Sequence, residues 1–352
     1  MALIDEINIP VPIENQNPLG FVDRYGFIFQ RGGSFPLNIL DTLLIRPLMV
    51  EGKTPGSMCD LAGKTEKNYV DFINDNQLTK VRFATKTFDI ARYCPSLQFI
   101  SVSPQFDFDE NLDLSPLYAL ENVRSLSLSI SFKQELRRKK YLPLANKTII
   151  DYTKIRGLEA LGVVLQPYGH VGYEKIPNLK SLFLTNYEGV DLWQAFCSPV
   201  LDSLSLSDAK IKTLDGIEQS KKMQCLTFLY CRSLHDLSAL KKVKSTLKSL
   251  SLLHCPKAKD LSVLSELENL EYLRIEGTFT IPDVEFLKGM KNLKTLILTC
   301  RVESGDMSPC LGIQTVYFDN KRHYNLKNED MQHTEPRVLG NEDIEAWRRI
   351  EI

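Results

Sequence analysis

The chain has 352 residues, 43% of them hydrophobic and 25% charged, with a formal net charge of −1. This composition is typical of globular proteins, and the balanced charge gives no overall field that would attract nucleic acid or an anionic membrane. The eight cysteines contain no C-x-x-C pair. The common zinc and thioredoxin-type spacings are therefore excluded, and a reducing compartment is favoured over a disulfide scaffold.

The N-terminal segment, residues 1–77, precedes any clear repeat. It carries acidic residues where a signal peptide needs basic ones, and no stretch of the chain reaches the roughly 18 unbroken apolar residues of a membrane span. We therefore expect a cytoplasmic protein. Arg31-Gly32-Gly33 is a candidate hairpin turn, and residues 67–76 are a candidate short helix. We expect this segment to be an N-terminal capping region, with an independent functional domain as the alternative.

From residue 78 onward one pattern recurs: an apolar residue, two variable residues, an apolar residue, one variable residue, and an apolar residue. We number positions from the first apolar residue of each copy. Because side chains alternate along a strand, positions 4 and 6 share one face. A single copy cannot bury that face, so the copies must stack into a continuous core. The copies begin at residues 78, 97, 123, 158, 179, 201, 223, 247, 270, 293 and 313.

The second half of each copy also repeats, with a shorter apolar motif such as Leu237–Leu240 and Leu261–Leu264. Asp236 and Asp260 stand directly before these motifs. Aspartate at the start of a helical turn accepts hydrogen bonds from backbone N–H groups that have no partner within the helix. We therefore predict short helical turns opposite the strands, with these two aspartates as their caps.

The repeats resemble the leucine-rich repeat family, and their length, about 22 residues, resembles the short bacterial and phosphatase-regulator classes. The resemblance implies an α/β solenoid: a leucine-rich repeat horseshoe with a concave parallel β-sheet and short helical or irregular convex segments. The family usually has Asn or Cys at position 9. Cys231 and Cys255 fit this pattern, whereas Asn186 and Asp208 come one residue early. The resemblance covers residues 78–319, which we take as the solenoid.

The long step from residue 123 to residue 158 contains an insertion at about 131–150. It holds five basic side chains, Lys133, Arg137, Arg138, Lys139 and Lys140. Such a cluster could contact phosphates or an acidic protein, but a solvated loop or helix face explains it as well. No stacking aromatic surface accompanies it, so nucleic-acid binding is not expected.

Positions 3, 5 and 7 of each strand should point away from the core, toward the concave side. In the middle repeats these positions hold mainly serine and threonine, whereas larger groups gather toward the C-terminal repeats. Exposed Tyr and Arg are frequent anchors of protein interfaces, although aromatic and hydroxyl side chains also simply favour strands. The candidate partner-binding residues are Phe183, Leu229, Leu253, Tyr272, Arg274, Glu276, Ile297 and Tyr317, centred on Tyr272, Arg274 and Tyr317.

The C-terminal segment, residues 320–352, is expected to be a cap that ends in a helix. Residues 341–352 begin with a candidate Asn cap, and Ile344, Trp347 and Ile350 recur every three residues, which places them near one helix face. Such a helix could fold back over the last repeat.

The sequence contains no complete catalytic motif. Two stretches imitate a phosphate-binding loop, Gly52-Lys53-Thr54 and Gly63-Lys64-Thr65, but Pro47 and Met58 stand where the motif needs its first glycine. The histidines are not paired at metal-ligand spacing. We expect a protein that is not an enzyme and uses no cofactor or metal.

The favoured function is a monomeric protein–protein interaction module that binds a partner protein on its concave face, such as a bacterial immunity or adaptor protein. The alternatives are a phosphatase-regulator-like subunit, a secreted internalin-like adhesion protein, and an enzyme or ligand-binding site in the N-terminal region.

Overall fold

The computed structural model describes residues 11–12, 20–22, 28–30, 42–45, 66–83, 88–102, 105–106, 114–128, 131–132, 150–165 and 169–331. Internal contacts divide the chain into two units, Met1–Tyr173 and Glu174–Ile352, which are described separately below. The predicted basic insertion falls mostly outside the described residues, as do both lysine-containing loops of the N-terminal segment and the predicted C-terminal helix.

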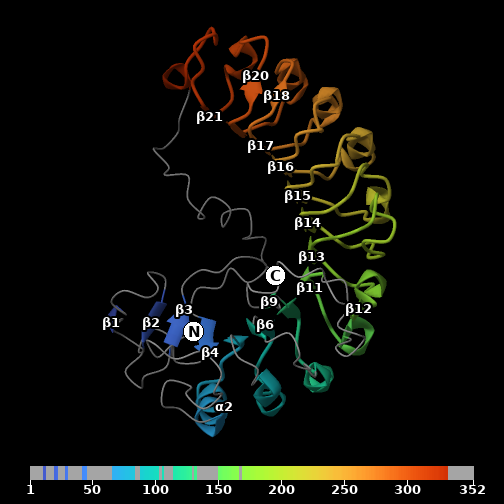
Figure 1. The fold of residues 1–352 in the computed structure, drawn as a ribbon, viewed down its shortest axis with the longest axis vertical. Coiled ribbons are helices and arrows are strands. Elements are labelled where there is room, and N and C mark those ends of the chain that lie inside the picture. Colours follow the sequence, from blue (N-terminus) through green and yellow to red (C-terminus); the bar gives the residue numbers. More distant parts are fainter. Residues whose placement is uncertain are drawn as a thin grey trace. The chain divides into compact units, whose positions relative to one another are not determined.

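The first unit contains a sheet whose strands follow chain order (Figure 1). Its first four strands pair antiparallel, and each later strand pairs parallel to the one before it. The sheet strands are β1 (Val11–Pro12), β2 (Gly20–Val22), β3 (Ile28–Gln30), β4 (Thr42–Ile45), β5 (Lys80–Phe83), β6 (Phe99–Val102), β8 (Ser125–Leu128) and β11 (Ala160–Val164).

Short elements connect these strands. The helix α2 (Glu66–Asp75) buries Tyr69, Phe72 and Ile73, which confirms the predicted short helix. The other connecting elements are the 3-10 helices η1 (Phe88–Tyr93), η2 (Ser115–Ala119) and η4 (Tyr152–Lys154), and the strands β7 (Gln105–Phe106), β9 (Ser131–Phe132), β10 (Ile150–Asp151) and β12 (His170–Val171). The 3-10 helix η5 (Tyr173–Lys175) spans the division between the two units. The antiparallel pair β3–β4 flanks the predicted Gly-Gly turn, which itself lies outside the described residues.

The second unit repeats one strand per copy, and a 3-10 helix follows the strand in each copy that begins at residue 201 or later; between residues 185 and 203 there is none. All pairings in its sheet are parallel. The sheet strands are β13 (Ser181–Thr185), β14 (Ser203–Ser207), β15 (Cys225–Leu229), β16 (Ser249–Leu253), β17 (Tyr272–Glu276), β19 (Thr295–Leu298) and β21 (Thr315–Phe318). The remaining elements are η6 (Ile217–Gln219), η7 (Ser238–Val243), η8 (Ser262–Glu266), η9 (Glu285–Gly289), η10 (Ser308–Cys310), η11 (Asn328–Asp330), β18 (Thr280–Ile281) and β20 (Arg301–Val302).

The core of the second unit consists of the apolar side chains at positions 4 and 6. Leu204 pairs in register with Leu226, and Leu226 with Leu250; all three are at most 1% exposed. Parallel strands stack about 4.8 Å apart, so each leucine packs against its equivalents in the neighbouring repeats. Burial of one such side chain contributes about 1.5–3 kcal/mol. The predicted inward orientation of positions 4 and 6 is confirmed.

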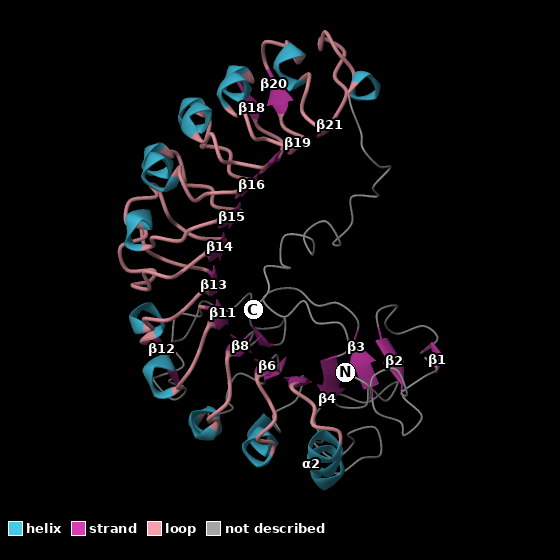
Figure 2. Ribbon diagram, turned by 180° about the vertical axis from the view of Figure 1, so that it is seen from behind, coloured by secondary structure: helices cyan, strands magenta, loops and turns pink. Residues whose placement is uncertain are grey.

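The side of the second unit opposite its sheet carries the 3-10 helices (Figure 2). Leu237 and Leu261 are the N-cap residues of two of these helices, so the predicted aspartates stand one residue earlier than a cap. They still make the predicted backbone bonds, because Oδ1 of Asp236 accepts from the N–H of Ser238 at 2.8 Å and Oδ1 of Asp260 accepts from that of Ser262 at 3.1 Å. Asp283 and Asp306 make the same contact in later repeats. The turns are 3-10 helices of a few residues, which suits a short repeat because i→i+3 bonding closes a turn in three residues.

In two copies the side chain at position 9 stabilises the turn after the strand. The Sγ of Cys231 donates to the carbonyl oxygen of Leu206 in the preceding strand at 3.7 Å, and the Sγ of Cys255 donates to that of Phe228 at 3.5 Å. Both cysteines are free and fully buried. They therefore bond the backbone between repeats at the position where the resemblance places Asn or Cys.

The chain after β21 packs back on the last two repeats. Oδ1 of Asn328 accepts from the N–H of Phe318 at 3.0 Å, and the hydroxyl of Tyr324 accepts from the N–H of Val302 at 2.8 Å. An edge strand presents unpaired N–H groups that invite pairing with another chain. These side chains satisfy two such groups, so the segment up to Met331 contributes to covering this end of the solenoid.

Candidate functional site

The open face of the second unit is the surface formed by positions 3, 5 and 7 of strands β13 to β21. Its columns run in register, since Phe183 lies across from Ser205, and Arg274 lies between Ser251 and Ile297. In Figure 1 the strands of this unit line the inner side of its arc. The open face is therefore a continuous surface to which every strand contributes alternate side chains, as the spacing predicts.

The middle of the open face consists of small side chains. Position 5 holds Ser205, Thr227 and Ser251 on three consecutive strands, and position 3 holds Ser203 and Ser249 on two of the same strands. These side chains rise little above the backbone, and Ser205, Ser249 and Ser251 are at most 9% exposed. Serine and threonine hydroxyls both donate and accept hydrogen bonds, and this part of the face is therefore polar without being charged.

Strand β17 carries a cluster of interacting polar side chains on the open face. The Nη2 of Arg274 donates to Oε2 of Glu276 at 3.0 Å, and its Nε lies 2.9 Å from Oε1. Burial disfavours the charged guanidinium, but hydrogen bonding and the charge of Glu276, with a contribution from the hydroxyl of Tyr272, raise the pKa of Arg274 overall. The three residues thus form one hydrogen-bonded cluster whose charges compensate each other.

The structure places the other predicted residues on the same face, with uneven exposure. Tyr317 is the most accessible at 37%, whereas Tyr272 is 5% and Ile297 is 3% exposed. Phe183, Leu229 and Leu253 are half-buried. The prediction of an exposed Tyr272 is wrong: its ring is covered within the sheet surface and its hydroxyl bonds to Arg274. Tyr317 is the accessible aromatic side chain among those predicted.

Sequence reasoning missed a row of residues at position 8, directly after the strands. Asn186, Asp208, Tyr230 and His254 all have left-handed φ, between 53° and 62°, and Gly277 has φ 147°. The rings of Tyr230 and His254 stack with centroids 4.7 Å apart and an angle of 9° between their planes. The signal was present, because Asn and Asp one residue early are the residue types that tolerate left-handed backbone.

Three histidines make hydrogen bonds within the described structure. The hydroxyl of Tyr152 lies 2.8 Å from Nδ1 of His170 in the interior of the first unit, where burial lowers the pKa of His170 to about 4. The rings of His235 and His323 bond to backbone carbonyl oxygens. Within the described ranges no group of three or more His, Cys, Asp or Glu side chains is arranged to hold a metal ion.

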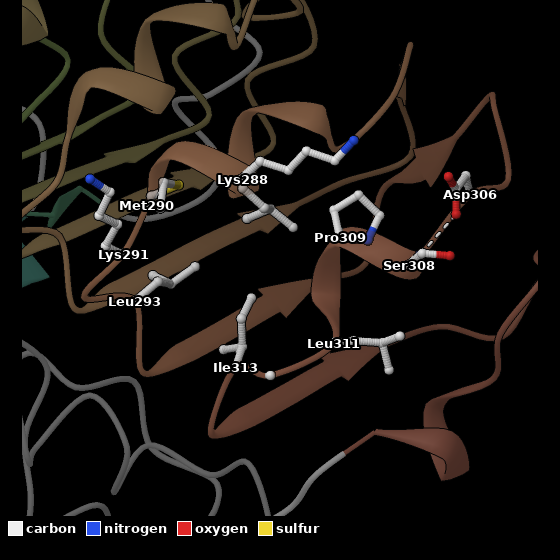
Figure 3. A pocket seen from close by; sticks show the side chains of 11 residues that line it. Lys288, Met290, Lys291, Leu293, Asp306, Ser308, Pro309, Leu311 and Ile313 are labelled. Atoms are coloured by element: carbon white, nitrogen blue, oxygen red, sulfur yellow. Dashed lines mark hydrogen bonds between the residues drawn. The ribbon is translucent and has the colours of Figure 1, made fainter.

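A groove of about 490 Å³ lies away from the open face, between η9 and η10 (Figure 3). Leu293 and Ile313 form part of its floor, and Lys288 and Lys291 stand at its rim. Lys288 is engaged by Glu285 at 2.5 Å. The groove is confined to the space between two repeats, whereas the open face runs across all of them.

A parallel sheet of in-register leucine repeats, backed by short helical turns, is the leucine-rich repeat architecture, and the predicted fold class is confirmed. No family model and no curated protein matches the sequence. Solved structures do resemble it. An internalin from Listeria monocytogenes has 14% identity and a TM-score of 0.46 over 74% of this chain and 75% of that one. A leucine-rich repeat protein from Leptospira interrogans has 12% identity and a TM-score of 0.31 over 73% and 87%.

Within the part of the chain that the structure describes, no helix has the length and apolar character needed to cross a bilayer.

Proposed function

We propose that the chain is a non-enzymatic protein-interaction module whose second unit binds a partner protein on the open face. The observation that carries this proposal is the continuity of the face: side chains from every strand from β13 to β21 lie in register on one surface. A surface built from many rigid strands can meet a folded protein over a broad area, and a specific interface needs about 800 Å² from each partner.

The distribution of side chains supports the same function. Small hydroxyl groups line the middle of the face, and the accessible ring of Tyr317 stands at one end. Binding energy in protein interfaces concentrates on a few aromatic and arginine side chains, surrounded by contacts that mainly exclude water. We assign the anchoring role to Tyr317 and Arg274, with Phe183, Leu229 and Leu253 as flanking contacts. Tyr272, Glu276 and Ile297 support Arg274 and the surface around it.

The test is affinity capture by the intact chain, comparing Tyr317→Ala and Arg274→Ala with a matched control on the opposite side of the unit. Leu311 is 57% exposed and lies on the outer groove, so Leu311→Ala removes a similar apolar side chain without touching the open face. We expect a partner protein that is lost with Tyr317→Ala and Arg274→Ala and retained with Leu311→Ala. Equal retention by all three variants would contradict the proposal.

A further inference from the structure

The position-8 row has a common backbone arrangement. The N–H of Asp208 donates to the carbonyl oxygen of Leu229 at 2.9 Å, that of Tyr230 to Leu253 at 2.8 Å, and that of His254 to Glu276 at 2.7 Å. Each of these residues thus turns the chain out of its strand while continuing the hydrogen-bond ladder by one step. The left-handed φ is a property of the turn and does not depend on which residue occupies it.

Tyr230 and His254 are unusual occupants of this row. Non-glycine residues in left-handed conformation cost about 1 kcal/mol or more, and Asn and Asp, which fill the two preceding places, tolerate it best. Tyr230 gains only partial burial in return, since it stacks on His254 and remains 40% exposed. Residues held in such conformations concentrate at binding sites. The repeat sets this conformation whichever residue is present, so what distinguishes Tyr230 is that it presents an accessible aromatic ring where Asn or Asp would be less strained.

The direction of the stack shows which ring face is free. Tyr230 and His254 occupy equivalent places on adjacent strands β15 and β16, so their stacking axis runs from strand to strand. Beyond His254, a Cβ on Gly277 would lie 2.8 Å from the ring of Phe279, so another aromatic side chain fills that end. On the other side of Tyr230 lies β14, where Ser207 pairs with Leu229 and the N–H of Asp208 donates to the carbonyl oxygen of Leu229. Asp208 is therefore the residue of β14 equivalent to Tyr230, on the side of the ring opposite His254.

Asp208 is a short, exposed carboxylate. Its Oδ2 accepts from the hydroxyl of Ser207 at 2.9 Å, and in the described part of the chain no lysine or arginine forms an ion pair with it. The nearby Lys210 is engaged by Glu188 at 2.5 Å instead. Because the aspartate side chain is much shorter than the tyrosine ring, the outer part of the ring face stays open above the carboxylate.

We propose that Tyr230 and Asp208 form a binding site for an arginine side chain of the protein partner. A guanidinium group is planar and stacks flat on an aromatic face while its N–H groups donate in plane to a carboxylate. Lysine fits less well, since its compact ammonium group is strongly hydrated and cannot stack. The inference rests on the proposed function, because it assigns one chemical feature to the partner, and it adds a site at the edge of the open face.

The experiment titrates the full chain, labelled with ¹³C in its leucine methyl groups, with N-acetyl-arginine amide and with its uncharged isostere N-acetyl-citrulline amide. Leu229 and Leu253 precede Tyr230 and His254 and report on binding. We expect saturable shifts with the arginine compound in the tens of millimolar or tighter, and binding of the citrulline compound weaker by roughly tenfold.

Two variants test the residues. Asp208→Asn should weaken arginine binding by roughly tenfold, and Tyr230→Asn by roughly threefold to tenfold. Asparagine suits a left-handed turn, so Tyr230→Asn removes the ring without adding strain, and its thermal unfolding should match or exceed that of the parent. Leu311→Ala, on the outer groove and away from the open face, is the control that should bind the arginine compound normally.

The site is refuted if arginine and citrulline compounds bind alike, if neither shifts the two leucines, or if Asp208→Asn binds as the parent does. This outcome is separable from failure of the proposed function. A partner lost with Tyr317→Ala but retained with Asp208→Asn and Tyr230→Asn leaves a protein-binding face and removes the arginine site. The opposite result is also informative. If the arginine compound binds specifically but no captured partner depends on Tyr317, the arginine site stands and the proposed function is overturned.

Discussion

Arg274 and Glu276 stand two residues apart on β17, and their side chains meet on the open face in a two-point contact with N–O distances of 2.9 and 3.0 Å. The side chains are only 24% and 21% exposed. Two residues of the same strand separated by one position point to the same side, so this pairing needs no long-range folding step. It fixes the guanidinium in one orientation before any partner arrives.

This ion pair should contribute measurably to stability. A double-mutant cycle with Arg274→Met and Glu276→Gln, measured by urea unfolding, should give a coupling energy of about 1 kcal/mol, because the pair is largely shielded from water. The coupling should persist in high salt, since partly buried charges are weakly screened. A coupling energy of zero would mean that solvent replaces the contact at no cost. The exposed pair Lys288–Glu285 serves as a comparison, because salt should weaken its coupling energy.

Because the core leucines at positions 4 and 6 pack in register, removing side-chain volume from one of them should lower the stability strongly. Leu250→Ala, at position 4 of β16, should lower the free energy of unfolding by about 2–5 kcal/mol, because Leu250 is fully buried and its neighbours on both adjacent strands are also leucines. Leu311→Ala should change it by less than about 0.5 kcal/mol. Similar effects of the two substitutions on the urea midpoint would contradict the packing described for this sheet.

The aspartate caps give stability a defined pH dependence. Hydrogen bonds from the side chain and backbone N–H of Ser262 lower the pKa of Asp260. Its folded pKa thus lies below its unfolded value of about 3.9, so the stabilisation is complete above that value and is lost as the pH falls through the folded pKa. Asp260→Ala should cost about 1 kcal/mol at neutral pH, and the difference from the parent should shrink in acid. A difference that stays constant between neutral and acidic unfolding curves would exclude the carboxylate as its source.

Local periodicity was sufficient to predict which side chains of strands β13 to β21 form the core, because alternation fixes which residues share a face. It could not predict how exposed each of the other strand side chains is. The burial of Tyr272 depends on Arg274 on its own strand and on the register with neighbouring strands, and that register depends on the length of each return segment. The type of helical turn, 3-10 and not α, also follows from how tightly the short return segment must close.

The position-8 row shows a second limit. In the sequence, Asn186 and Asp208 stand at position 8, one residue before the place where the family usually has Asn. The structure shows that the two positions differ: position 8 forms the left-handed turn, and Cys231 and Cys255 at position 9 are buried. Tyr230 and His254 carry no turn signal of their own, so their conformation was set by the repeat and not by their identity. Sequence reasoning finds such residues only when the register of the repeat is known.

The buried thiols between repeats should be chemically silent while the protein is folded. The contact of Cys231 with Cys255, together with burial, raises the pKa of Cys231, and only the thiolate reacts with alkylating reagents. The same contact lowers the pKa of Cys255, so the protection of Cys255 rests on its complete burial. Cys197 is exposed. Under native conditions iodoacetamide should modify Cys197 faster than Cys231 or Cys255 by on the order of 100-fold or more, since the latter two need local unfolding to be reached. Peptide mass spectrometry over time gives the rates, and labelling in denaturant, where the cysteines should react alike, is the control.

Rapid modification of Cys255 in the folded chain would show that the turns after β15 and β16 open readily, and would remove the rigid support that the arginine site requires.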